Sequence, residues 1–223
     1  DMSSQLEAII GHTFSDQAWL TGASSTSARA FGALEHLGDA IADLAVAITC
    51  WRADLDAERA ACLVCNEHLD ERFQALLQGH VKARSGDVIE AIVGAVFLDA
   101  DFETAAAAAV KLCAPGMTWR PLASGESIDD VPLWLGPIAI DAIITADAVP
   151  RFGATNTSQG ELTEHRKALV NHAALKPAVE RSLAAEGIET DDPIHWFHRE
   201  VTRMLIQSGW EPTARFVLSV LQP

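Results

Sequence analysis

The sequence predicts an all-α fold. Apolar residues recur at helical spacing along almost the whole chain, whereas the alternating apolar and polar runs of half-buried strands are essentially absent. Hairpin dipeptides such as Asn-Gly are essentially absent too. With 223 residues, 49% of them hydrophobic, the chain is long enough for one large globular domain or for two of roughly a hundred residues each.

The clearest helix lies in the first quarter of the chain. Five apolar residues recur there at spacings of three and four and form one stripe: Leu34, Leu37, Ile41, Leu44 and Ile48. Further helices are predicted over residues 58–77, over residues 87–98 and around the alanine run 105–109.

A segment in the middle of the chain separates two predicted domains. Residues 114–130 are rich in Pro, Gly and Ser, which is typical of a linker. The part of the chain after this segment weakly repeats the part before it: 37–43 pairs with 135–141, 63–69 with 169–175, and 101–103 with 209–211. The offsets of 98, 106 and 108 grow in order, as loop insertions in a duplicated domain would make them. We therefore expect domains at 1–113 and 131–223, joined by the linker 114–130.

Two pairs of acidic residues lie on predicted helices. Glu35 and Asp39 fall about 40° apart, nearly opposite the apolar stripe, and Asp87 and Glu90 fall about 60° apart. Small residues that would let the two helices approach closely lie beside both pairs: Gly38, Ala42, Ala45, Ala91, Gly94 and Ala95.

Four converging carboxylates would repel one another unless a cation neutralised them. Divalent cations such as Mg²⁺ prefer oxygen ligands, including carboxylates and phosphates. The spacing is thus compatible with a metal site, and it leaves open the alternative of a solvated acidic face.

At these residues the chain resembles the ribonuclease III family. Residues 34–39, Leu-Glu-His-Leu-Gly-Asp, resemble the family's first signature, usually Leu-Glu-Phe-Leu-Gly-Asp. Residues 86–99, Gly-Asp-Val-Ile-Glu-Ala-Ile-Val-Gly-Ala-Val-Phe-Leu-Asp, resemble the second, and residues 10–16 resemble the opening turn. The resemblance covers roughly residues 5–112.

The resemblance implies an all-helical endoribonuclease that hydrolyses double-stranded or structured RNA by a two-metal mechanism. It implies that Glu35, Asp39, Asp87 and Glu90 are the metal-binding catalytic acids. The implied cofactor is Mg²⁺, with Mn²⁺ as a possible substitute.

Three departures from the family pattern concern substrate contacts and partner geometry rather than the metal site. Phe-Gly-Ala at residues 31–33 replaces a polar Asn-Glu-Arg. His36 takes the place of the aromatic residue that, in the family, plugs into the partner domain. Leu-Thr-Gly-Ala-Ser-Ser at residues 20–25 replaces a run of the Leu-Thr-His-Arg-Ser type.

The second copy lacks the acids. Residues 159–172 are similar to the family's middle helix and turn, but Leu133 and Pro137 replace the first acidic pair. His195 and His198 replace the second pair, either as transition-metal ligands or as ordinary histidines. Proline is disfavoured inside a helix, so we expect the helix to start or kink at Pro137.

The second domain is thus predicted to be a catalytically inactive scaffold. Because ribonuclease III domains work in pairs, the resemblance implies an intramolecular pseudo-dimer with one active centre. Such pairing would let the chain act as a monomer.

The charge bears on partners. With 31 acidic and 16 basic residues the net charge is −15, which argues against tight, autonomous binding to long duplexes. No segment resembles a double-stranded RNA-binding domain, so we expect a protein partner that supplies RNA affinity. Two rival interpretations stay open: a non-catalytic ribonuclease III-like subunit of a ribonucleoprotein or RNA-processing complex, and a protein-interaction module.

Composition also bears on location. The four cysteines include a single CxxC without a second pair, which favours buried free thiols over zinc ligands: Cys50, Cys62, Cys65 and Cys113. We expect a reduced intracellular compartment, cytoplasmic or organellar. No apolar run reaches the ~18 residues of a membrane span, and the start shows no secretory signal pattern. Whether a transit peptide was removed stays open.

Overall fold

The computed structural model describes residues 2–81, 85–127 and 131–222, and within them it confirms the all-helical prediction. The first seven helices are α1 (Met2–Ile10), α2 (Gln17–Ala23), α3 (Phe31–Arg52), α4 (Ala57–Val64), α5 (Asn66–Leu76), α6 (Asp87–Asp99) and α7 (Phe102–Cys113). The others are α8 (Leu135–Phe152), α9 (Gln159–Val170), α10 (His172–Glu186), α11 (Pro193–Ser208) and α12 (Trp210–Leu221). None of these helices is long and apolar enough to cross a membrane.

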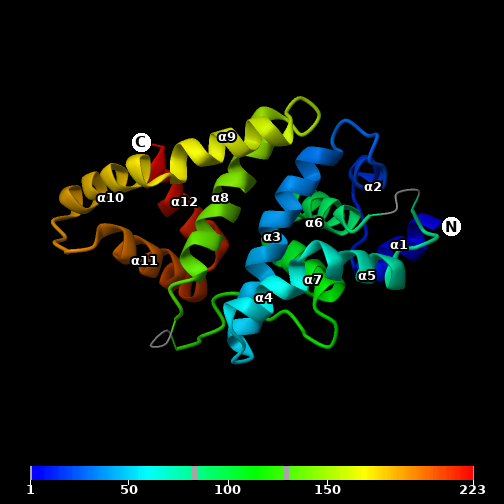
Figure 1. Cartoon of the computed structure of the whole chain (residues 1–223), viewed down its shortest axis with the longest axis horizontal. Helices are drawn as coiled ribbons and strands as arrows, with labels where there is room; N and C mark the ends of the chain where they lie inside the picture. Colours follow the sequence, from blue (N-terminus) through cyan, green and yellow to red (C-terminus); the bar gives the residue numbers. More distant parts are fainter. Residues whose placement is uncertain (1, 82–84, 128–130, 223) are drawn as a thin grey trace.

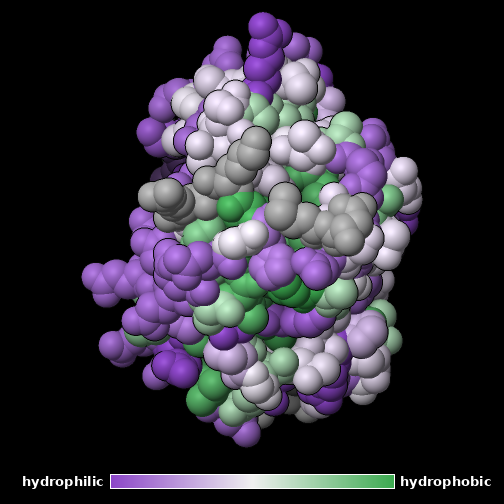
Figure 2. Space-filling view, turned by 90° about the vertical axis from the view of Figure 1, so that its right-hand side faces the viewer, coloured by the Kyte–Doolittle hydropathy of each residue, from purple (hydrophilic) through white to green (hydrophobic). Residues whose placement is uncertain are grey.

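Two long helices, α3 and α8, pack against each other in the middle of the molecule. Helices α1, α2 and α4–α7 lie on the α3 side, and α9–α12 lie on the α8 side (Figure 1). The face that carries α1 and α2 is largely hydrophilic, with hydrophobic residues near its centre (Figure 2). Leu6, Leu20 and Val81 help to line a cavity of about 370 Å³ between these helices.

Helices α3 and α6 touch through their backbones. A Cβ atom added to Gly38 would lie 1.7 Å from the carbonyl oxygen of Glu90, and one added to Gly94 would lie 2.1 Å from the carbonyl oxygen of Leu34. No side chain fits at either position, so each helix presents a glycine to the other. Most of α3 from Leu34 to Cys50 is buried, because α4, α7 and α8 pack against it as well as α6, and this fits its mainly apolar sequence.

Helices α8 and α11 make a contact of the same kind. A Cβ atom added to Gly136 would lie 2.7 Å from the carbonyl oxygen of His198. Gly136 follows Gly38 by 98 residues, and His198 follows Glu90 by 108, which are two of the offsets found in the sequence.

A second correspondence lies between the middle helices. The extended backbone of Cys65 (φ −72°, ψ 151°) separates α4 from α5, and that of Asn171 (φ −63°, ψ 148°), 106 residues later, separates α9 from α10. The turns at Cys65 and Asn171 are thus separated by 106 residues, which is the remaining offset found in the sequence.

The predicted helix over residues 58–77 is wrong as a single element, because α4 ends at Val64 and α5 begins at Asn66. The break at Cys65 lets Leu63 of α4 and Leu69 and Phe73 of α5 all reach the core. The helix predicted over 87–98 and the one around 105–109 are confirmed as α6 and α7. Pro137 lies in the first turn of α8, where a missing N–H costs nothing, as predicted.

The four cysteines are free, as expected, but they are not all buried. Cys50 and Cys113 are buried, whereas Cys62 and Cys65 are exposed, so burial of the CxxC pair was wrongly predicted. Ala60 and Leu63 form the buried face of α4, and Cys62 falls outside that face, whereas Cys65 lies in the extended break between α4 and α5.

The predicted linker is held against both halves of the chain. Arg52 at the end of α3 forms an ion pair of 2.6 Å with Glu126, and the indole nitrogen of Trp119 donates to Glu103 at 2.8 Å. The backbone N–H of Ala123 donates to the carbonyl of Ile206 at 3.0 Å. Residues 128–130 of this linker lie outside the described residues.

Replacing Gly38 by alanine tests the backbone contact between α3 and α6. The added methyl group has no room, so the helices must separate, and we expect a loss of ~2–3 kcal/mol in the free energy of unfolding. This corresponds to a fall of roughly 4–12 °C in Tm for a chain of this size. Differential scanning calorimetry would measure it.

Gly160→Ala is the matched control, because the nearest atom to its added Cβ is the Ser158 hydroxyl at 3.8 Å. Alanine there should leave Tm unchanged or raise it slightly. Equal Tm values for Gly38→Ala and the unchanged chain would contradict the close contact.

Candidate metal site

The site lies where α3 and α6 cross. Glu35 stands in the second turn of α3, and Asp87 and Glu90 stand in the first turn of α6. The start of α6 is fixed from α5, because the N–H of Gly86 donates to Asp70 Oδ1 at 2.6 Å. A side chain at Gly86 would collide with Leu69, whose Cβ lies 2.7 Å from the position of the added atom.

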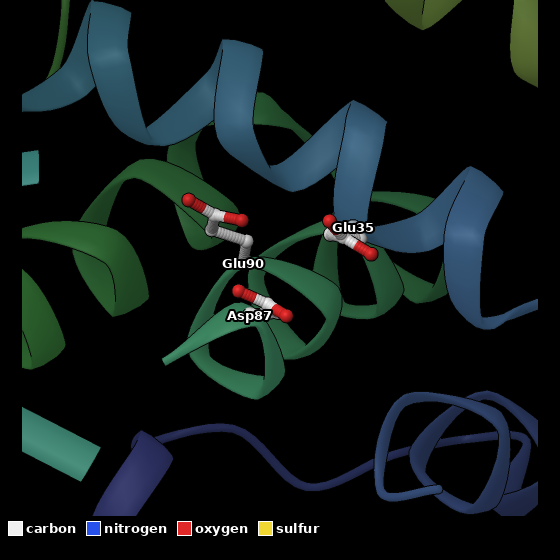
Figure 3. Close-up of side chains that lie close together, drawn as sticks. All are labelled: Glu35, Asp87 and Glu90. Carbon is white, nitrogen blue, oxygen red and sulfur yellow. The ribbon is translucent and has the colours of Figure 1, made fainter. Parts of the chain in front are cut away.

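Three of the four predicted acids come together. A carboxylate oxygen from each of Glu35, Asp87 and Glu90 lies within 4.8 Å of the other two. The three side chains point toward one another from the two helices (Figure 3). In the part of the chain that the structure describes, no other group of three or more His, Cys, Asp or Glu side chains is placed to hold a metal ion.

Asp39 stands outside this group. It lies one turn along α3 from Glu35, on a cavity of about 120 Å³ that is also lined by Asp43, Asp141 and Arg166. Its charge still reaches the site, because among the charged groups that raise the pKa of Glu90 it has the largest effect. The fourth acid thus acts electrostatically on Glu90 and Glu35 but faces α8 and α9.

Burial and like charge strongly perturb Glu90. Its side chain is only 8% exposed. Burial, and then the carboxylates of Asp39, Asp87, Glu35 and Asp43, raise the pKa of Glu90 to about 9. Every charged neighbour that shifts this pKa is itself an acid. Glu90 is therefore protonated at neutral pH unless a cation joins the cluster.

The pKa values of the α3 acids are raised as well. Burial is the main cause for Glu35, opposed by a hydrogen bond from the Gln159 side chain. For Asp39 burial again comes first, and the nearby Arg166 guanidinium opposes it. Both acids thus receive their opposing interaction from α9.

Asp43 and Asp141 lie close to Asp39, although the sequence prediction did not include them in the site. They lie on α3 and α8 at the same cavity, and Arg166 Nη1 bonds Asp141 Oδ2 at 3.0 Å. Burial, with the charges of Asp39 and Asp141, raises the pKa of Asp43 to about 7. The spacing of Asp39 and Asp43 was visible in the sequence, whereas their approach to Asp141 and Arg166 depends on tertiary packing.

His36 lies at the same cavity, between α3 and the second half of the chain. Its Nε2 atom is buried and has no hydrogen-bond partner among the residues that the structure describes. Burial, and then the Arg166 charge, lower the pKa of His36, so its imidazole is neutral at pH 7.

The positions that the sequence offsets pair with the four acids carry no such cluster among the described residues of the second half. Leu133 is 41% exposed and precedes α8, and Pro137 lies in the first turn of that helix. On α11, His195 Nε2 lies 3.4 Å from Arg199, and burial lowers the pKa of His198.

The residues present at the α3–α6 crossing fit a hard divalent cation. All three donors are carboxylates, which suit Mg²⁺ or Mn²⁺ better than softer metals. The raised pKa of Glu90 shows that the cluster lacks compensating positive charge of its own. A bound cation would allow Glu90 to ionise.

Comparison with known proteins gives one significant similarity among curated proteins. The chain is 33% identical over 125 residues to a protein named Ribonuclease 3 from Idiomarina loihiensis, a match that covers 45% of this chain and 54% of the relative. The chain therefore spans about half the length of the relative that it matches. No family model matches the chain, and no solved structure is significantly similar to it. The match supports a ribonuclease III-like chain at the level of the family.

Proposed function

We propose that this protein is a metal-dependent endoribonuclease of the ribonuclease III type, which hydrolyses phosphodiester bonds in double-stranded or structured RNA. The observation that carries the proposal is the convergence of Glu35, Asp87 and Glu90 at a crossing where two helix backbones touch. The identity to Ribonuclease 3 supports the same activity.

The proposed cofactor is Mg²⁺, with Mn²⁺ as a substitute. When bound, two such ions supply an activated water and stabilise the leaving 3′ oxygen. Glu35, Asp87 and Glu90 would act as direct ligands, and Asp39 would complete the set from one turn along α3. The chain itself fixes the carboxylates, because α3 and α6 cannot slide apart without losing the Gly38 and Gly94 contacts.

We further propose that residues 1–113 and 131–223 are tandem ribonuclease III-like domains that pair within one chain. Support comes from the glycine contacts at Gly38 and Gly136 and from the turns at Cys65 and Asn171, which recur at the offsets found in the sequence. The second domain would serve as scaffold, so one active centre would cut one strand per binding event.

The net negative charge of the chain favours a protein partner that binds the RNA. A net charge of −15 disfavours tight binding to the phosphates of a long duplex by the chain alone. A protein partner that supplies RNA affinity fits this charge, and so does the rival function of a non-catalytic subunit in an RNA-processing complex.

A cleavage assay separates the two functions. Short structured RNA duplexes with Mg²⁺ should be cut by the unchanged chain, and the Asp39→Asn, Glu90→Gln double variant should lose more than ~100-fold in rate, because it removes ligand charge itself rather than a supporting contact. Labelling each strand separately should show a cut in one strand only.

The control is the Glu189→Gln, Asp191→Asn double variant, which makes the same chemical changes at exposed positions. It should cleave at the unchanged rate. Equal rates for all three chains, over several substrates and with cell extract added to supply a partner, would favour the non-catalytic subunit.

Glu90→Gln tests the charge balance of the site. Because the pKa of Glu90 is about 9 when folded and near 4.5 when unfolded, the folded chain keeps a proton that the unfolded chain has lost between these pH values. Stability therefore falls as pH rises through this window, and glutamine removes the penalty. We expect a metal-free Tm higher by at least ~2–4 °C at pH 7.5, and a much smaller difference at pH 5.

Adding Mn²⁺ should reverse the order at pH 7.5, because only the ionised carboxylate gains from the cation. Glu67→Gln, an exposed site of the same chemistry, should follow the unchanged chain throughout. If metal-free Glu90→Gln melts no higher than the unchanged chain at pH 7.5, the charge conflict described for the site is absent.

A further inference from the structure

Helix α9, from the second half of the chain, lies against α3 at the metal site. Its start is fixed by a capping box, in which the Ser158 hydroxyl accepts from the Glu161 N–H and the Glu161 carboxylate accepts from the Ser158 N–H. This cap makes Gln159 the first residue of the helix.

The Gln159 side chain lies against α3 at Gly32. A Cβ atom added to Gly32 would lie 3.5 Å from Gln159 Cγ and 3.8 Å from its Cδ. The Gln159 side chain thus passes beside the first turn of α3, one turn before Glu35. Hydrogen bonding by this side chain opposes the burial that raises the pKa of Glu35. Gly32 is one of the residues that depart from the family pattern, and here it leaves an open path for the glutamine.

The same side of α9 follows α3 further along. Arg166, seven residues after Gln159, lies at the cavity with Asp39 and Asp43, whose positions on α3 follow Glu35 by four and eight residues. Two turns of α9 therefore run beside the acidic row of α3 in one register, so the contact at Gln159 belongs to an extended packing of the two helices.

We propose that Gln159 is a positioning residue, by which the second half of the chain orients Glu35 for metal binding. The inference rests on the proposed function. A carboxylate has two oxygens, so one can accept from the amide while the other binds a cation. Partners of this kind orient metal ligands, and their loss typically costs 10–100-fold in metal affinity.

Such a role gives the second half a direct part in the site. A scaffold would stabilise the first half without changing how tightly a folded chain binds metal. A positioning residue changes the affinity at constant stability, and this difference can be measured.

Gln159→Met is the test variant, because methionine keeps the length of the side chain and removes its amide. Gln159 is exposed, so the fold should persist, and Tm would confirm it. Mn²⁺ binding, followed by electron paramagnetic resonance of the free ion, should weaken about 10-fold or more relative to the unchanged chain. RNA cleavage should fall at low Mg²⁺ concentration and recover at saturating Mg²⁺.

The matched control is Gln5→Met, an exposed glutamine on α1, which should bind Mn²⁺ as the unchanged chain does. Equal Mn²⁺ affinity of Gln159→Met and Gln5→Met would overturn the role of Gln159 and leave the proposed function intact. If the unchanged chain binds Mn²⁺ no better than Asp87→Asn, the proposed function fails, and the role of Gln159 falls with it.

Discussion

The structure depends on the contact of two helix backbones at Gly38 and Gly94. With no side chain between them, α3 and α6 approach until a carbonyl of each helix lies against a glycine of the other. Glycine weakens a helix by about 1 kcal/mol relative to alanine, so each helix loses intrinsic stability at this point. The loss is offset by the close packing of a long buried helix, and the same approach sets the distance between Glu35 and the acids of α6. Fold and candidate site thus share one geometric cause.

That approach creates an electrostatic conflict. Burial and surrounding carboxylates raise the pKa of Glu90 to about 9, so the metal-free site relieves its repulsion by keeping a proton. Further along α3 the conflict is relieved differently, because Arg166 of the second half faces Asp39 and pairs with Asp141. The negative charge around α3 is thus offset in two ways. Near α6 a proton or a cation offsets it at Glu90, and near α8 the Arg166 guanidinium of α9 offsets it at Asp39.

Local periodicity explains what could be predicted from the sequence. The all-helical fold, α6 and α7 and the facing of Glu35, Asp87 and Glu90 follow from spacings of three and four residues, with small residues beside the acids. The break at Cys65 was missed because the residues around it are compatible with a continuous helix, and only the core positions of Leu63 and Leu69 require a turn. The separation of Asp39 from the other acids, and the approach of Gln159, depend on how α8 and α9 pack against α3, which no local pattern encodes.

The pairs α3–α6 and α8–α11 share a close glycine contact but differ in the side chain carried by the facing residue. At Gly38 and at Gly136 the close approach involves only main-chain atoms and Cβ positions, so it tolerates any side-chain chemistry on the facing helix. Glu90 faces one glycine, and His198 faces the other. The glycine contact itself therefore does not require an acid on the facing helix. The α8–α11 crossing thus has a close glycine contact with His198 at the position where the α3–α6 crossing has Glu90, and the buried like charge around Glu90 belongs to the α3–α6 crossing.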